Sequence, residues 1–263
     1  MKKSAMTVLN ALLVLACLAL LWQILIWTFA IPKFMLPTPF AVAKAAVSRY
    51  SSLLTSVWIT GKAAACGLIA SVLAGILIAV IFAQSRWIRR MFYPYTILLQ
   101  TVPIIAIAPL ILMWVGPGIL AVMVIAFIIC LPAIIANTTQ GLISVERNLI
   151  ELFLMHNAKP AEVLWKLRLP HAIPSLFTGL RIASGVSVIG AIIGELFAGS
   201  TRVGEGGLGY AIQYASSQLE TDYLFALVFA ASALGFAFFF IIMFLEWYFL
   251  HNWHESARAA ESD

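Results

Sequence analysis

The chain has 263 residues, of which 63% are hydrophobic and 10% are charged, and its net charge is +5. Ordinary soluble domains are about 45–50% apolar and about 25% charged, so this composition excludes a typical water-soluble fold. The basic residues stand singly or in small groups between apolar runs, a pattern that marks membrane orientation and argues against a nucleic-acid partner. The sequence therefore predicts an integral membrane protein in contact with lipid.

The first apolar run follows Met1-Lys2-Lys3 and continues from Val8 to Ala30. It exceeds the hydrophobic region of a signal peptide and matches the roughly 20 residues that cross the hydrocarbon core, so we expect an uncleaved helix. No alternating β-barrel pattern occurs, and backbone polar groups in lipid need internal partners, which helices provide. We predict an all-α polytopic fold, a single domain over residues 1–263 with six transmembrane helices. The five further spans are expected at residues 56–83, 92–115, 118–138, 174–198 and 223–250.

The basic residues predict that both termini are cytoplasmic, because cytoplasmic loops carry an excess of Lys and Arg. Ten fall on the side of the termini: Lys2, Lys3, Arg86, Arg89, Arg90, Arg147, Lys159, Lys166, Arg168 and Arg258. Four fall on the other side: Lys33, Lys44, Arg49 and Arg202. Lys62 and Arg181 lie near span ends, where they can snorkel to an interface, and they are left out of the comparison.

Prolines interrupt the third predicted span at Pro94, Pro103 and Pro109, and Gly116-Pro117-Gly118 predicts a tight turn into the next span. A broken span is tolerated only where protein or a water-filled cavity satisfies the freed backbone groups. Pro103 and Pro109 are therefore candidates for the wall of a transport pathway. The alternative is a kinked helix packed on its neighbours. Before these spans, the external segment 40–50 is compatible with a short surface helix.

The long polar connection from Gln140 to Pro174 contains apolar residues at helical spacing and predicts two short amphipathic helices. We expect Asn157 to end the first helix in the left-handed conformation and Pro160 to occupy the first turn of the second. Three partners are open for the apolar faces: the bilayer interface, the ends of the protein's own spans, or a groove on a separate cytoplasmic protein.

Residues 151–170 read ELFLMHNAKPAEVLWKLRLP, which resembles the EAA loop of ABC importer permeases. Glu151 stands at the acidic place of that motif, Asn157 at its glycine place, Leu167 at its hydrophobic place, and Leu169-Pro170 at the terminal pair. Leu152 and Phe153 depart from the two small residues of the motif, and Asn157 departs from its glycine. The resemblance implies an ATPase-coupling loop within residues 140–173, with these site residues: Glu151, Asn157, Ala158, Lys159, Leu167, Leu169 and Pro170.

The resemblance extends over nearly the whole chain. Leu36-Pro37-Thr38-Pro39, the Arg86–Arg90 cluster, Pro170 to Pro174 with Gly179-Leu180-Arg181, and Gly194-Glu195 with Gly207 to Tyr210 resemble the nitrate/sulfonate/taurine permease family. Within it, residues 166–170 and Ser216-Ser217-Gln218-Leu219 are more similar to the branch for thiamine-precursor pyrimidines and riboflavin.

This resemblance implies a type I ABC importer permease with a core five-helix unit at roughly residues 56–250. Two permease subunits, this chain and a second copy of it, would together line one pathway for a small organic or anionic solute. Two ABC ATPase subunits would bind ATP and Mg, and an external or periplasmic binding protein would deliver the solute. The chain itself would be a non-catalytic, multi-pass inner-membrane subunit without a cofactor, and it contains no GxxxxGK[ST] sequence.

Glu195 is the one carboxylate predicted well inside a span, where a charged residue is costly and hence a functional candidate. We consider a pathway or gating role for it, or a bond to interfacial water or a neighbouring backbone. Residues 204–210 are glycine-rich and predict a tight external turn, with a binding-protein contact as the resemblance-based alternative. His251 and His254 stand at helical spacing, but two ligands do not make a metal site, and no metal is expected.

The rival hypothesis is an ion-coupled secondary transporter, with a membrane-embedded enzyme as a third possibility. Secondary transporters usually show two related halves and several buried polar or charged groups. This chain shows no evident duplication, one deep carboxylate and one large amphipathic loop. These features favour the importer permease.

Overall fold

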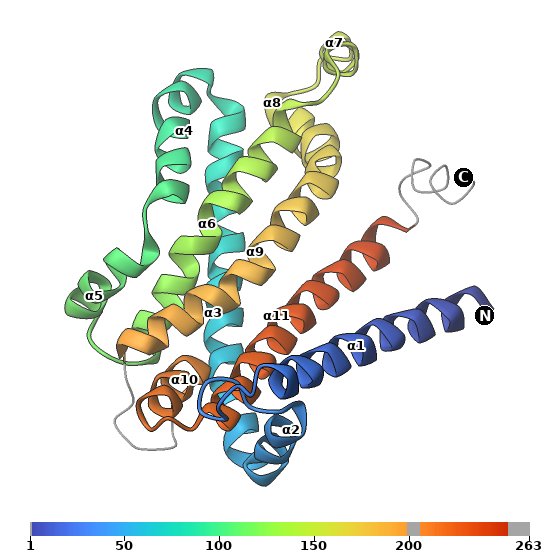
Figure 1. Ribbon diagram of the computed structural model, residues 1–263. Helices are drawn as coiled ribbons and strands as arrows, with labels where there is room; N and C mark the ends of the chain where they lie inside the picture. The colour runs from blue at the N-terminus through green and yellow to red at the C-terminus, as the bar shows by residue number, and fades with distance from the viewer. Residues whose placement is uncertain (1, 199–205, 252–263) are drawn as a thin grey trace.

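The computed structural model describes residues 2–198 and 206–251, and every regular element in these residues is a helix (Figure 1). The helices are α1 (Lys2–Thr28), α2 (Pro39–Ser48), α3 (Tyr50–Gln84), α4 (Arg86–Thr101), α5 (Ile104–Val115), α6 (Ile119–Ile143), α7 (Arg147–Met155), α8 (Pro160–Val163), α9 (Leu169–Ala198), α10 (Leu208–Ser217) and α11 (Thr221–Leu250), with a π-helical segment at Leu164–Arg168. The predicted all-α class is confirmed.

Within the described residues, four helical segments are long and apolar enough to cross a membrane: α3, α6, the continuous helix Pro160–Ala198, and α11. The bent pair α4 and α5 makes a fifth if it counts as one span. The multi-pass fold is therefore confirmed, whereas the predicted number of six is not. The first predicted span, residues 8–30, overlaps α1.

Helix α6 lies at the centre of the bundle and packs closely against α3 and α9, because glycines let the backbones approach. A Cβ atom on Gly67 of α3 would lie 2.6 Å from the Ala126 Cβ of α6. A Cβ atom on Gly190 of α9 would lie 2.7 Å from Ile129. Because no hydrophobic driving force acts between helices in lipid, close van der Waals packing at small residues stabilises these helix contacts instead.

The third predicted span, 92–115, is broken at a single proline. Val102 adopts an extended conformation before Pro103, as residues before proline favour, and α4 and α5 meet at an angle of 101°. Pro94 and Pro109 lie inside α4 and α5, so the prediction that they also interrupt the span is wrong. The predicted turn before α6 is confirmed by positive φ angles of +91° at Gly116 and +131° at Gly118.

The long polar connection between α6 and α9 differs from the prediction in its second half. Helix α7 ends as expected at Asn157, whose φ is +54°. The N–H groups of Asn157 and Ala158 donate to the carbonyls of Leu154 and Phe153, each at 3.0 Å, in the 5→2 and 6→1 pattern of a Schellman motif. Pro160 begins the next helix, as predicted.

No second separate helix follows, because α8, the π segment and α9 form one helix over Pro160–Ala198. The N–H of Leu169 donates to the Leu164 carbonyl five residues back. This wider turn comes directly before Pro170, which lacks an N–H and would clash with the carbonyl four residues back in a regular α-helix. The helix therefore continues through Pro170 into the span that the sequence predicted to begin at residue 174.

Helices α2 and α10 lie at the end of the bundle opposite α7 (Figure 1). The predicted surface helix at 40–50 is present as α2, with Thr38 accepting a hydrogen bond from the Ala41 N–H at 3.2 Å. The predicted tight turn over 204–210 is wrong for its last three residues, which begin α10. Arg202, Gly204, Glu205, His254 and Arg258 lie outside the described residues.

Candidate functional site

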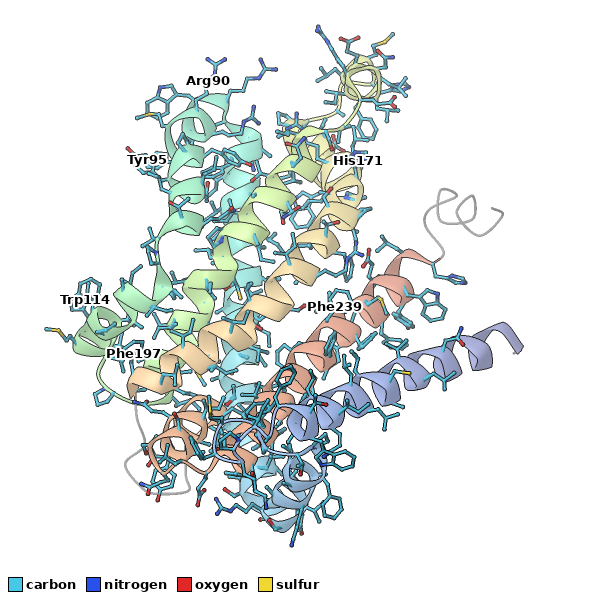
Figure 2. The ribbon with its side chains drawn as sticks, viewed as in Figure 1. Arg90, Tyr95, Trp114, His171, Phe197 and Phe239 are labelled. Atoms are coloured by element: carbon cyan, nitrogen blue, oxygen red, sulfur yellow. The ribbon has the colours of Figure 1, made fainter. Side chains whose placement is uncertain are left out.

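Helix α7 stands at the tip of the bundle, and its side chains radiate outward (Figure 2). None of its nine residues is buried, and the exposed fractions of Leu152, Leu154 and Met155 are 49%, 57% and 80%. The apolar side chains of α7 therefore do not cover the ends of the protein's own spans. For α7 that alternative is wrong, which leaves the bilayer interface and a separate protein. In the second half of the loop, Leu164 and Leu169 do pack on the ends of α3 and α6.

Two ion pairs of the (i, i+4) type lie on the same surface. Arg147 Nε is 2.8 Å from Glu151 Oε1, and Lys166 Nζ is 3.0 Å from Glu162 Oε1. Glu162 also accepts a hydrogen bond from the Lys159 N–H at 2.9 Å, so it caps the start of the long helix. All four charged side chains of these pairs are well exposed, and such pairs are worth only about 0.3–0.5 kcal/mol each. Their charges shape the surface more than they stabilise the fold.

The predicted coupling residues fall into two groups. Glu151, Asn157 and Lys159 are exposed, and Ala158 is half-buried in the turn. Leu167, Leu169 and Pro170 are half-buried on the continuous helix, and Leu169 packs on the cluster of Ala79, Ala83, Leu142 and Ala172. The first group is available for contact with another molecule, and the second group attaches the loop to the bundle.

Arg168 contributes to this attachment of the loop to the bundle, because its Nη1 donates to the Ala83 carbonyl near the end of α3 at 3.0 Å. His171 follows one turn later, and its Nε2 is 3.4 Å from Ser144 Oγ at the end of α6. The start of the long helix is therefore connected to both α3 and α6. A displacement of the loop would be transmitted to the core rather than absorbed by a loose linker.

At the other end of α9, Glu195 is buried, with an exposed fraction of 4%. Its oxygens lie 2.8 and 2.9 Å from Thr60 Oγ1, and its Oε2 accepts a hydrogen bond from the Gly209 N–H at 2.9 Å. Thr60 Oγ1 in turn accepts from the Leu208 N–H at 2.8 Å. Two of the N–H groups at the start of α10 are thus satisfied by side chains of α9 and α3.

Gly207 directly before α10 and Gly209 within it permit this arrangement. We call it the outer latch and define it by Thr60, Glu195, Gly207 and Gly209. A Cβ atom on Gly207 would lie 2.0 Å from Glu195 Oε1, and one on Gly209 would lie 2.3 Å from the Ile192 carbonyl. The N-terminus of a helix carries partial positive charge, so a carboxylate is well placed there. The expected bond from Glu195 to a neighbouring backbone is confirmed.

The other two candidate pathway residues lie elsewhere. Pro103 forms the break between α4 and α5, and Pro109 lies within α5. A cavity of about 630 Å³ opens beside the break, lined by Val102 and Ile104 from the bent pair and by residues of α6 and α9. Among the described residues, the hydrogen bonds of Glu195 run to α3 and α10, so the structure does not bring the three candidates into one cluster.

Sequence reasoning missed two contacts of α9. The sequence leaves Arg181 to snorkel to an interface, but Arg181 Nε lies 3.2 Å from Glu246 Oε2 and joins α9 to α11. Opposite charges in two apolar spans were a usable signal for this pair. Thr60 gave no such signal, because a single threonine in an apolar run is ordinary.

Within the described residues, a further ion pair lies at the end of the bundle that carries α2 and α10. Arg49, between α2 and α3, makes a bidentate contact with Glu220 before α11, with Nη2 2.8 Å from Oε1. Its guanidinium carbon lies 4.8 Å from the centre of the Tyr223 ring. The hydrogen bond from Arg49 lowers the pKa of the Glu220 carboxyl. This contact joins α2 to α11 at the surface.

The bundle, the protruding loop and the continuous helix define a membrane permease, and comparison with known proteins identifies its family. Residues 71–252 match the model of the binding-protein-dependent transport system inner membrane component. The chain belongs to this family of ABC transporter permeases, which are non-catalytic membrane subunits. Its assignments as a transporter subunit and as a multi-pass membrane protein are confirmed.

Individual relatives agree with this assignment. The chain is 30% identical to a probable ABC transporter permease protein of Haemophilus influenzae over 90% of this chain and 95% of that protein. It is 31% identical to the formylaminopyrimidine transport permease protein ThiX of Halalkalibacterium halodurans (83% and 85% covered). It is 33% identical to the taurine transport system permease protein TauC of Escherichia coli (60% and 56%).

A solved structure confirms the fold. A chain of the inward-facing MetNI methionine ABC transporter superposes with a TM-score of 0.59 at 21% identity, covering 74% of this chain and 97% of that one. The predicted fold of a type I importer permease is therefore confirmed.

Proposed function

We propose that this chain forms the translocation pathway of an ATP-driven importer for a small organic or anionic solute and couples transport to ATP hydrolysis on partner subunits. Residues 56–250 form the core five-helix unit, and a second copy completes the pathway. ABC ATPase subunits bind the loop within residues 140–173, and an external or periplasmic binding protein delivers the solute at the end that carries α2 and α10. The chain binds neither ATP nor Mg itself.

The observation that carries this proposal is the uncovered apolar surface of α7. Leu152, Leu154 and Met155 remain exposed at the tip of the bundle, beside charged side chains. An amphipathic helix in this position fits a groove on another protein, since apolar anchors at helical spacing give affinity and flanking charges give orientation. The resemblance of residues 151–170 to the EAA loop supports an ATPase as that protein.

The continuous helix Pro160–Ala198 offers a direct route between the two sides of the membrane. Its first turns carry the coupling residues Leu167, Leu169 and Pro170, and Glu195 near its last turn holds the start of α10. A push on the loop would move α9 as a rigid element and strain or release the outer latch, which gives Glu195 a gating role without contact with the solute. The break at Pro103 supplies a place for α5 to follow this movement.

The distribution of charge supports cytoplasmic termini. Arg90 lies at the same end of the bundle as α7 (Figure 2), while Lys33, Lys44 and Arg49 surround α2 at the opposite end. The excess of basic residues on the α7 side agrees with the usual rule for cytoplasmic loops. An ATPase at α7 requires the same orientation.

The names of the relatives support a range of solutes. Relatives named for formylaminopyrimidine and riboflavin transport match 83% and 80% of this chain. Relatives named for taurine and aliphatic sulfonates also match. These names favour a pyrimidine-like or riboflavin-like solute, because the relatives named for such solutes are 31% identical over 83% and 80% of this chain. The Bacillus subtilis relative named for aliphatic sulfonates is 26% identical over 86%, and the taurine permease matches only 60%.

Substitution of Glu151 by Lys tests ATPase docking. We expect Glu151→Lys to reduce co-purification of the ATPase at least tenfold while membrane insertion is unchanged, because the substitution reverses a charge on an exposed loop helix. Glu151 also pairs with Arg147, so the single variant adds a repulsion within α7. The double variant Arg147→Glu, Glu151→Lys restores an ion pair in the opposite order and separates the two effects.

If docking depends on the charge at residue 151, the double variant stays impaired; if the single variant only destabilises α7, the double variant recovers. Normal ATPase binding by Glu151→Lys would contradict the assigned role. The rival, an ion-coupled secondary transporter, predicts uptake by the purified chain alone in liposomes with an ion gradient. Such uptake would overturn the importer proposal.

A further inference from the structure

The cavity beside the Pro103 break is made by the least charged part of the chain. Residues 91–145, which include most of α4 and all of α5 and α6, contain no Asp, Glu, Lys, Arg or His. The cavity measures about 630 Å³, within the usual range of about 300–1,000 Å³ for small-molecule sites. Its walls are mostly Ile, Leu, Val and Ala, and its lining residues include no charged side chain.

Charges elsewhere in the spans are already engaged. Away from the ends of the described spans, the cations are Lys62 and Arg181. Lys62 Nζ lies 5.1 Å from the centre of the Trp58 ring, and Arg181 is paired with Glu246. Neither cation lines the cavity. An anion in this cavity would therefore be desolvated without a counter-charge, which is unfavourable.

The polar groups of the cavity are two carboxamides, Gln100 from α4 and Asn137 from α6. Asn137 Nδ2 donates to the Ala133 carbonyl at 2.8 Å, which leaves its second N–H as a donor and its oxygen as an acceptor. A carboxamide with both functions matches the adjacent donor and acceptor atoms at the edge of a nitrogen heterocycle, as in the pairing of Asn or Gln with adenine. Branched apolar walls suit the faces of a planar ring.

We infer that this cavity is a passage site for uncharged, planar nitrogen heterocycles, such as a pyrimidine or a flavin ring, and that it disfavours sulfonates. This inference rests on the proposed importer function and narrows its solute class. A second copy of the chain related by a two-fold axis would contribute the same uncharged helices, so a homodimeric pathway keeps this character. Gln100 and Asn137 favour heterocycles because they can hydrogen-bond to them. The absence of a cation in the cavity disfavours sulfonates because their charge would have no partner.

The test uses the permease with its ATPase subunits in lipid nanodiscs, without the binding protein, so that the permease alone selects. Saturation-transfer NMR detects weak binding of three probes: 4-aminopyrimidine, riboflavin and the anion ethanesulfonate. We expect both heterocycles to bind at least tenfold more tightly than ethanesulfonate. We expect Asn137→Leu combined with Gln100→Leu to weaken heterocycle binding at least fivefold, because the apolar volume remains and the hydrogen bonds are lost.

The matched control is Gln84→Leu, which removes an exposed carboxamide at the end of α3 outside the cavity and should change nothing. Three results would overturn the inference: ethanesulfonate binding as tight as that of the heterocycles, no heterocycle binding, or unchanged binding by the double variant. ATPase co-purification is measured on the same preparation, and ATP-dependent uptake is measured on the same complex reconstituted into liposomes together with a binding protein. Uptake of a sulfonate by an intact complex would reject the inference alone, whereas failure to bind an ATPase would reject the importer proposal.

Discussion

The two ends of the helix Pro160–Ala198 differ in whether their side chains are buried by contacts within the same chain. At the α10 end, the carboxylate of Glu195 is buried, and its partners Thr60 and Gly209 belong to the same chain. At the α7 end, the charges are exposed, and apolar side chains of the neighbouring α7 remain uncovered. The α10 end is completed by contacts within one chain, whereas the α7 end leaves apolar surface uncovered within it.

This difference indicates where substitutions should act. Changes in the outer latch should lower the stability of the chain itself, because they break buried contacts. Changes at the α7 end should leave stability nearly unchanged and affect the proposed assembly, because exposed ion pairs contribute little. A substitution in the latch that leaves the unfolding transition unchanged would contradict this difference between the two ends.

The largest effect is expected from Gly209→Ala. The added Cβ would lie 2.3 Å from the Ile192 carbonyl, and backbone atoms cannot move aside as a flexible side chain can. We expect a loss of about 1–3 kcal/mol or more in the free energy of unfolding, measured in mixed detergent micelles. The control is Gly185→Ala in the same bundle, where nothing lies within 4 Å of the new Cβ. It should be neutral or slightly stabilising, because Ala favours helix over Gly.

An intermediate effect is expected from Thr60→Val, which keeps the shape of the side chain and removes its hydroxyl. The Leu208 N–H loses its acceptor and Glu195 loses a donor, so the free energy of unfolding should fall by about 1–3 kcal/mol. Thr55→Val on the same helix is the matched control, since the exposed Thr55 donates only to the Ser51 carbonyl. Equal effects of the two variants would show that the latch contributes no stability.

The smallest effect is expected from protonation of Glu220. Arg49 lowers the pKa of this carboxyl in the folded protein, so the stabilisation is complete at neutral pH. It is lost as the pH falls below the ordinary Glu value of about 4.3 and through the lowered value. Because both side chains are partly exposed, we expect under about 1 kcal/mol. The difference in unfolding temperature between the native chain and Glu220→Gln should shrink from pH 7 to pH 3; a constant difference would contradict this assignment.

Local chemistry made several features predictable. The helical class and the approximate positions of the spans followed from apolar runs, because lipid offers no hydrogen-bond partners to the backbone. The left-handed Asn157 and the helix start at Pro160 followed from side-chain and ring geometry within a few residues. The outward-facing Glu151 followed from the amphipathic pattern of the loop.

Other features depended on contacts between distant residues. The helix continues through Pro170 because a π turn precedes it and Arg168 fixes that turn to the end of α3. The bend falls at Pro103, while Pro94 and Pro109 are accommodated within helices. Neither outcome is encoded in the proline pattern, since a proline removes the same N–H in each case and the surroundings determine whether the helix tolerates the loss.

The sequence by itself determined that this protein is a helical membrane permease, because apolar run length, scattered charge and the motif at residues 151–170 are properties of the chain in order. Only the tertiary structure decided that Glu195 holds α10 through Thr60 and Gly209, and that α7 remains uncovered. The physical reason is distance along the chain: Thr60 and Glu195 are 135 residues apart, and only the packing of α3 against α9 brings them within hydrogen-bonding reach.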